Sequence, residues 1–174
     1  MGKSEQIITE ELARPFNEED LEWRVQRCGH KRNSTDVYCI VLAYVTNRAV
    51  FERLDSVMGI FGWQNEYKEL ASGGLLCGIS LKFDGLWVTK WDGADKTQVE
   101  PVKGMISGSH KRAGVPWGIG RYLYQLPVTF GDVASSGSER GSFLVDPKNK
   151  NSDRIWFNWN PPKMPSIFLP KGGN

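Results

Sequence analysis

The side chains with the clearest potential for chemistry are cations that share a stretch without acids. The 174-residue chain has a formal net charge of only +2, so its charge as a whole predicts no polyanionic partner. Residues 101–131, however, carry Lys103, Lys111, Arg112 and Arg121 and contain no aspartate or glutamate. Adjacent basic side chains on a helix can contact consecutive phosphates, which predicts sequence-independent, salt-sensitive binding of nucleic acid. A solvated helix face is the alternative interpretation of the same pair.

Residues suited to catalysis are few. The two histidines, His30 and His110, lie outside any recognisable nucleophile motif. Asp55 followed by Glu66 and Lys68 resembles the acid and Glu-x-Lys pattern of a magnesium-dependent nuclease. Glu66 and Lys68 are equally typical of the solvated face of a strand, and no G-x-x-x-x-G-K-[ST] phosphate loop is present. We therefore predict a non-catalytic protein with no nucleotide cofactor and no metal, and keep the nuclease as an alternative.

Cysteine usage and hydropathy predict the compartment. Cys28, Cys39 and Cys77 are odd in number and widely spaced, which is typical of reduced thiols inside a cell. No charged n-region with an apolar h-region opens the chain, and no apolar run has the length of a membrane span. We expect a soluble, cytoplasmic protein.

Hydrophobic periodicity predicts the elements that position the cations. We expect a short helix at 9–16, strands at 21–27 and 37–45 around a polar turn, a helix from 46 to 59, strands at 63–70, 75–83 and 86–91, and a helix at 102–124. Asp84-Gly85 predicts a hairpin turn, because its tight geometry needs positive φ. Pro116 predicts that the last helix is kinked or ends near it. Asp92, between a tryptophan and a glycine, is predicted to lie in a turn.

The composition changes after residue 127 to Ser, Gly, Asn and Pro. We predict a flexible loop at 135–141, a hairpin over 143–159 and a proline-rich tail. The chain is therefore divided into a core domain at 1–130 and a C-terminal extension at 131–174. For Trp156, Phe157 and Trp159, packing against the domain or a neighbouring subunit is favoured over stacking on DNA.

Several separated motifs resemble a known family. The run SGSHKRA at 107–113, leading to GIGRYLYQLP at 118–127, resembles the terminal helix of phage and bacterial Rad52-type single-strand annealing proteins. Upstream motifs occur in the family's order: VLAYVTNRA at 41–49, FGWQNEY at 61–67, CGISL at 77–81 and WVTKWDGA at 87–94. The resemblance covers roughly residues 10–127. Several motifs in the correct order are more specific than any one of them alone.

The resemblance implies an α+β fold of β-hairpin, helix, three-stranded antiparallel sheet and helix (β-β-α-β-β-β-α), whose copies form a ring or helical oligomer. It also implies ATP-independent binding and annealing of single-stranded DNA in recombination and double-strand-break repair. The groove-lining Lys-Arg pair of the family corresponds to Lys111 and Arg112, and the arginine of its first core helix corresponds to Arg48. Lys103 matches a basic position earlier in the last helix, and Arg121 is a further candidate from the acid-free stretch. Candidate partners are further copies of the chain, a single-strand-binding protein and an exonuclease, in a bacterial or phage-infected cell.

A physical argument favours annealing over strand protection. Pairing with a second strand requires free bases, so an annealing protein should hold phosphates with Lys and Arg and should not stack every base. One rival remains from another class. A helix, three antiparallel strands and a helix is also the element order of a double-stranded RNA-binding module, which would act as a monomer.

Overall fold

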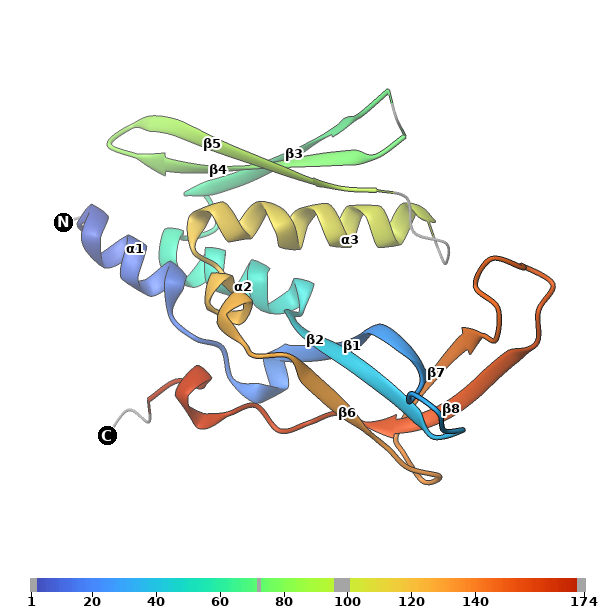
Figure 1. Cartoon of the computed structure of the whole chain (residues 1–174). Helices are drawn as coiled ribbons and strands as arrows, with labels where there is room; N and C mark the ends of the chain where they lie inside the picture. Colours follow the sequence, from blue (N-terminus) through green and yellow to red (C-terminus); the bar gives the residue numbers. More distant parts are fainter. Residues whose placement is uncertain (1–2, 72, 96–100, 172–174) are drawn as a thin grey trace. The chain divides into compact units, whose positions relative to one another are not determined.

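A computed structural model describes residues 3–71, 73–95 and 101–171 of the chain (Figure 1). The fold is mixed α+β with antiparallel sheets, as predicted. The chain forms two compact units: unit 1 comprises Met1–Leu21, Val45–Tyr124 and Ile167–Asn174, and unit 2 comprises Glu22–Tyr44 and Gln125–Ser166. The two units do not follow the order of the chain as a boundary at residue 130 would. The hairpin of residues 21–45 pairs with strands from the C-terminal part of the chain and lies with them in unit 2.

Unit 1 combines helices with a three-stranded sheet. Its main elements are α1 (Glu5–Ala13), α2 (Asn47–Met58), β3 (Trp63–Glu69), β4 (Leu75–Phe83), β5 (Leu86–Ala94) and α3 (Pro101–Gly114), with short 3-10 helices η1 (Glu18–Asp20), η2 (Val115–Trp117) and η3 (Arg121–Gln125). The three strands pair in the order β3-β4-β5 as an antiparallel meander. Helix α3 lies along one face of this sheet (Figure 1).

Local sequence signals explain the ends of α2 and the turn of the meander. The side chain of Thr46 accepts a hydrogen bond from the amide of Ala49 at 3.3 Å, which is the geometry of an N-cap. Gly59 follows the helix with a φ of +73°. In the turn between β4 and β5, Asp84 and Gly85 have φ values of +46° and +81°, as the hairpin signal predicts.

The predicted turn around Asp92 is wrong. Asp92 lies within β5 and is paired with Cys77 of β4, so the strand continues through Trp91 and Gly93. An aspartate beside a glycine is typical turn chemistry when only its neighbours are considered. Here the ladder with the buried strand β4 determines the conformation.

Helix α3 forms in spite of its many glycines. The helix ends at Gly114, and Pro116 lies in the short helix η2 that follows, which confirms the predicted effect of the proline. Gly108 shows what the glycines allow: a Cβ at this position would lie 3.3 Å from the Cβ of Ala94 on β5. The small residues therefore permit a close approach of the helix to the sheet, and this packing compensates for the poor helix propensity.

Arg53 of α2 holds the end of α1. Helix α1 begins at Glu5, earlier than predicted, and ends at Ala13, two residues before Pro15. The guanidinium of Arg53 donates hydrogen bonds to backbone carbonyls at this end of the helix, namely those of Glu11 (3.0 Å), Leu12 (3.2 Å), Arg14 (2.6 Å) and Pro15 (3.4 Å). A cation at a helix C-terminus satisfies carbonyls that lack partners within the helix. These bonds fix α1 against α2.

Unit 2 is built from one antiparallel five-stranded sheet. Its strands are β1 (Leu21–His30), β2 (Val37–Val45), β6 (Thr129–Val133), β7 (Glu139–Leu144) and β8 (Arg154–Asn160), in the order β1-β2-β6-β8-β7. The short helix η4 (Ser166–Phe168) begins at the last residue of unit 2 and continues in unit 1. The hairpins of residues 21–45 and 143–159 were both predicted, but β6 was not, and the loop predicted at 135–141 overlaps β7. Gly141 explains part of the difference. A Cβ there would lie 2.4 Å from the ring of Phe157, so the glycine makes room for an aromatic residue.

One face of the unit 2 sheet carries a hydrophobic core. Its buried residues are Cys39, Val41, Phe157 and Trp159. The edge strands β1 and β7 approach each other: the ring of His30 on β1 packs edge-on against that of Phe143 on β7, with the ring centroids 5.2 Å apart. The sheet therefore curls around its own core.

Among the helices of the described residues, none combines the length and apolarity needed to cross a membrane.

Candidate nucleic-acid interface

All five cations predicted from the sequence lie in unit 1. Arg48 is in the first turn of α2, Lys103, Lys111 and Arg112 lie on α3, and Arg121 begins η3. Lys103 and Arg112 are exposed, whereas Lys111 is half-buried. The candidate site is therefore formed by α2, α3 and the short helix η3, and its geometry depends on how α2 and α3 are held together.

A buried hydrogen bond joins the two cation-bearing segments. Nδ1 of His110 on α3 lies 2.7 Å from Oδ1 of Asn47 at the start of α2, and the imidazole stacks on Phe51 at 4.3 Å. His110 is fully buried at 0% exposure. Burial lowers its pKa from 6.5 to about 4, so the ring is neutral near pH 7. Asn47 directly precedes Arg48, and His110 directly precedes Lys111, so this bond fixes the two cations relative to each other.

Helix geometry sets the directions of the neighbouring side chains on α3. Successive residues of an α-helix are about 100° apart around its axis. His110 points toward α2, where it meets Asn47, and Arg112 points toward β5, where it meets Asp92. Lys111 therefore leaves the helix between these two directions.

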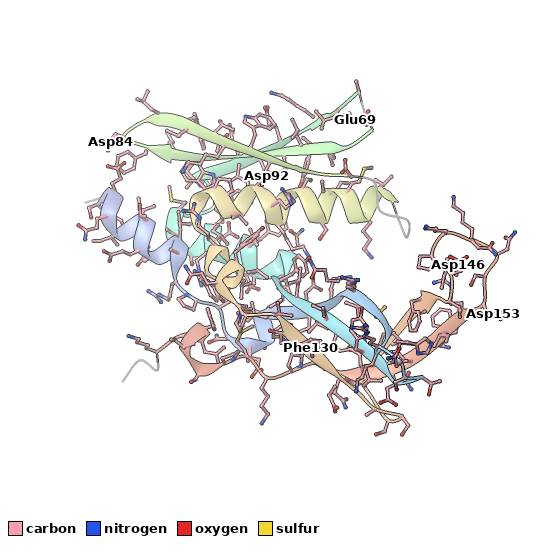
Figure 2. All side chains as sticks on the ribbon, viewed as in Figure 1. Glu69, Asp84, Asp92, Phe130, Asp146 and Asp153 are labelled. Atoms are coloured by element: carbon pink, nitrogen blue, oxygen red, sulfur yellow. The ribbon has the colours of Figure 1, made fainter. Side chains whose placement is uncertain are left out.

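The structure adds acidic partners that the sequence analysis did not find. Arg48 contacts Asp20 at 3.3 Å and Glu52 at 3.1 Å, and Arg112 contacts Asp92 at 3.1 Å. Asp92 is labelled in Figure 2, between β5 and α3. The stretch 101–131 is free of acids along the chain but not in space. The contact between Arg48 and Glu52 could have been predicted, because residues four apart are neighbours on a helix. The contacts with Asp20 and Asp92 depend on the tertiary fold.

In these ion pairs the guanidinium groups face solvent, whereas the carboxylates of Asp20 and Asp92 are only 18% and 30% exposed. The side chains of Arg48 and Arg112 are 63% and 55% exposed. Ion pairs of this kind contribute about 0–1 kcal/mol, so a phosphate can replace a carboxylate at little cost. The pairs hold each guanidinium in position before a ligand arrives.

Arg121 supports the end of α3. Its guanidinium donates to the carbonyl of Val115 at 2.8 and 2.9 Å and to that of Pro116 at 2.7 Å. Lys90 donates to the Pro116 carbonyl at 3.1 Å and lies 4.1 Å from the ring centroid of Trp117. Both cations contact carbonyls just beyond the helix, and that of Val115 also accepts a hydrogen bond from the amide of Gly118 at 2.9 Å. Arg121 thus stabilises the helix that carries the Lys-Arg pair, and a contact with DNA stays a prediction for it.

The residues of the alternative nuclease site, Asp55, Glu66 and Lys68, do not converge on one point. Asp55 accepts a hydrogen bond from the indole N–H of Trp63 at 2.7 Å, and Glu66 pairs with Lys68 at 3.0 Å. Trp63 and Glu66 are three residues apart on β3, so they lie on opposite faces of the sheet. Over residues 3–71, 73–95 and 101–171, no three His, Cys, Asp or Glu side chains are placed to hold a metal ion.

Removing the carboxylate partner of Arg112 tests whether this arginine binds the phosphates of DNA. We expect Asp92→Asn to bind single-stranded DNA up to about fivefold more tightly at low salt, because an exposed ion pair of about 0–1 kcal/mol no longer competes. The amide oxygen of asparagine can still accept the bond from the Gly93 amide that Asp92 receives at 2.7 Å. Fluorescence anisotropy with a labelled oligothymidine measures the affinity.

The matched control is Asp84→Asn, which makes the same charge change in the β4–β5 turn, at a residue whose positive φ asparagine tolerates. Equal gains in both variants would indicate a general charge effect. No gain for Asp92→Asn relative to Asp84→Asn would show that the Asp92 carboxylate does not compete with DNA for Arg112.

Comparison with known proteins gives two findings. The profile described as Rad52/22 family double-strand break repair protein matches residues 4–140. The single-stranded DNA-binding protein DdrA of Deinococcus radiodurans is 32% identical over 127 residues, which is 72% of this chain and 58% of that relative. The chain therefore spans 58% of the length of this relative. The family match includes all five cations, and strand β8 lies beyond it.

Proposed function

The chain belongs to the Rad52/22 family of double-strand break repair proteins, and we propose that it binds single-stranded DNA and anneals complementary strands in recombination and repair. The observation that carries this proposal is the pairing of two helices by the His110–Asn47 bond, which positions Arg48 beside the segment of Lys111 and Arg112. The printed name of the relative DdrA, a single-stranded DNA-binding protein, supports the same ligand.

The proposed mechanism holds the strand by its phosphates. Arg48, Lys111 and Arg112 exchange their protein contacts for phosphate oxygens, and the bases of the strand stay free to pair. Each base-pair step formed with a complementary strand contributes about 1.4 kcal/mol. Annealing therefore needs no ATP, because the protein has only to align strands whose pairing is already favourable.

The proposal includes assembly into a ring or helical oligomer. The candidate site of one copy offers only a few cations, so a long strand is held best when copies repeat the same contact along it. Head-to-tail contacts between identical copies generate rings when they close and filaments when they do not. Further proposed partners are a single-strand-binding protein and an exonuclease, in the cytoplasm.

Hybridisation kinetics test the function directly. Two complementary oligonucleotides, one with a donor dye and one with an acceptor, are mixed with and without the protein, in the absence of nucleotide and magnesium. We expect the protein to raise the hybridisation rate, and light scattering to show oligomers on single-stranded DNA. A rate equal to that of the protein-free sample would contradict annealing.

Two further outcomes would favour the rival functions. Stronger binding of duplex RNA than of single-stranded DNA by a monomer would indicate an RNA-binding module. Magnesium-dependent cleavage that is lost in Glu66→Gln would indicate a nuclease.

A further inference from the structure

One tryptophan of unit 2 remains exposed between two arginines. Trp156 on β8 is 55% exposed, whereas the neighbouring aromatic residues Phe157 and Trp159 are buried in the core. The guanidinium carbon of Arg140 lies 4.4 Å from the centroid of the Trp156 ring, and that of Arg154 lies 6.0 Å from it. We call Trp156, Arg140, Arg154 and Ser142 the Trp156 cluster.

The register of β7 and β8 positions the cluster. Trp156 is directly opposite Ser142, while Arg140 and Arg154 are each two residues away on their own strands. Residues two apart on a strand point to the same face, so the indole has one cation beside it from each strand. Arg154 also donates to the hydroxyl of Ser142 at 3.0 Å. The cluster is therefore built on paired strands and not on a loop.

The cations of the cluster are not neutralised by carboxylates within the described chain. Arg140 and Arg154 form no ion pair with a described residue, unlike Arg48 and Arg112 of unit 1. The acid nearest in sequence to Arg140 is Glu139, which points to the other face of the sheet because it is the next residue along the strand. The cluster thus combines an exposed aromatic ring with two available positive charges.

Two acids near the cluster in sequence belong to the end of the hairpin. Asp146 and Asp153 lie beyond the last strand pair, in the turn region between β7 and β8 (Figure 2). The amide of Lys148 donates to the Asp146 carboxylate at 2.9 Å, so this acid is engaged in the turn. Between their first and last strand pairs, β7 and β8 therefore place two arginines and no carboxylate on the face that carries Trp156; Asp132 of the neighbouring strand β6 lies opposite Asn160, farther along this face.

This combination of groups fits a single-stranded nucleic acid. In the free protein both guanidinium groups lie over the indole ring, Arg140 more closely than Arg154. When a guanidinium leaves the ring, an unpaired base can stack on the exposed indole, and the two arginines can contact the phosphates before and after that base. We propose that the Trp156 cluster is a second single-strand contact, in which Trp156 stacks on one base and Arg140 and Arg154 bind the flanking phosphates. The inference rests on the proposed function and adds to it a contact that depends on the base. It lies outside the part of the chain that the family profile covers, except for Arg140 at its limit.

An abasic ligand separates base stacking from phosphate binding. The full chain is titrated with an oligothymidine and with an abasic deoxyribose-phosphate oligomer of the same length. We expect Trp156→Ala to bind oligothymidine about tenfold more weakly, since stacking contributes about 1–3 kcal/mol per base, and to bind the abasic oligomer as the unmodified protein does. Trp156→Phe retains an aromatic face and should recover most of the affinity.

The arginines have their own control. Arg140→Ala with Arg154→Ala should weaken binding of both ligands and lower the salt dependence. Lys148→Ala with Lys150→Ala removes the same charge from the turn of the same hairpin, and should have a smaller effect. Equal losses in the two double variants would show that the hairpin acts only through its overall charge.

The outcomes distinguish this inference from the proposed function. If the unmodified protein neither binds oligothymidine nor speeds hybridisation, the proposed function fails. If it does both, and folded Trp156→Ala binds oligothymidine without loss, only the Trp156 cluster is overturned. A change in oligomer size in Trp156→Ala, with equal losses for both ligands, would assign the cluster to a subunit interface and would also overturn the inference.

Discussion

Alanine at both Lys111 and Arg112 is expected to lower the affinity for single-stranded DNA by at least about tenfold at low salt, since two phosphate contacts are lost. The slope of log affinity against log salt should become shallower by about 1.4, because each contact with a single strand contributes about 0.7. Both side chains lie near the surface of α3, so the fold should persist. Anisotropy titrations at several salt concentrations measure both quantities, and light scattering checks that the oligomer persists.

The chain contains a second Lys-Arg pair that serves as the control. Lys31 and Arg32 are exposed in the turn between β1 and β2, so Lys31→Ala with Arg32→Ala removes the same residue types and the same charge. We expect a much smaller loss of affinity from this pair. Equal losses in the two double variants would mean that net charge alone governs binding. Unchanged affinity of the folded Lys111→Ala, Arg112→Ala variant would contradict a DNA-binding role for this pair on α3. Arg48→Ala should weaken binding in the same direction.

Local signals in the sequence predicted the elements whose ends are determined by nearby residues. Thr46 and Gly59 define α2, and Asp84-Gly85 defines the hairpin, because capping and positive φ act over a few residues. Strand β6 and the strand conformation of Asp92 escaped prediction, since both depend on partners elsewhere in the chain. Gly141 is part of the predicted loop at 135–141, but it lies in β7, where it makes room for Phe157.

The candidate site was predictable as a set of cations but not as an arrangement. Residue type and the family resemblance selected Lys111 and Arg112, whereas their relation to Arg48 depends on a bond between residues 63 positions apart in the sequence. The role of Arg121 at the end of α3 was equally hidden, because helical spacing says nothing of the carbonyls beyond Gly114. For Trp156, alternation along β8 separates the exposed ring from its buried neighbours only once the core face of the strand is known.

Acid should destabilise the protein through His110. The folded protein binds a proton at this ring only near pH 4, whereas the unfolded chain binds it near pH 6.5. Between these values the unfolded state holds more protons, so the free energy of unfolding falls as the pH is lowered, by up to about 3 kcal/mol from this group. His110→Gln removes the titration and keeps a polar partner for Asn47, although the lost stacking on Phe51 should destabilise it by roughly 1–3 kcal/mol near neutral pH. The stability difference between the two proteins should therefore narrow as the pH falls from 6.5 toward 4.

Denaturant unfolding of both proteins, followed by circular dichroism from pH 7 to pH 4.5, measures this difference, and carboxylates that titrate in both proteins cancel in it. His30→Gln removes an imidazole from an exposed site and serves as the control. Parallel pH profiles for the unmodified protein and His110→Gln would contradict the buried, neutral state of this ring. DNA binding at pH 7 provides a readout that is independent of stability. His110→Gln still contains Arg48, Lys111 and Arg112, but it lacks the His110–Asn47 bond that positions them. A folded His110→Gln protein should bind single-stranded DNA more weakly with an unchanged salt slope, which distinguishes displaced cations from missing ones.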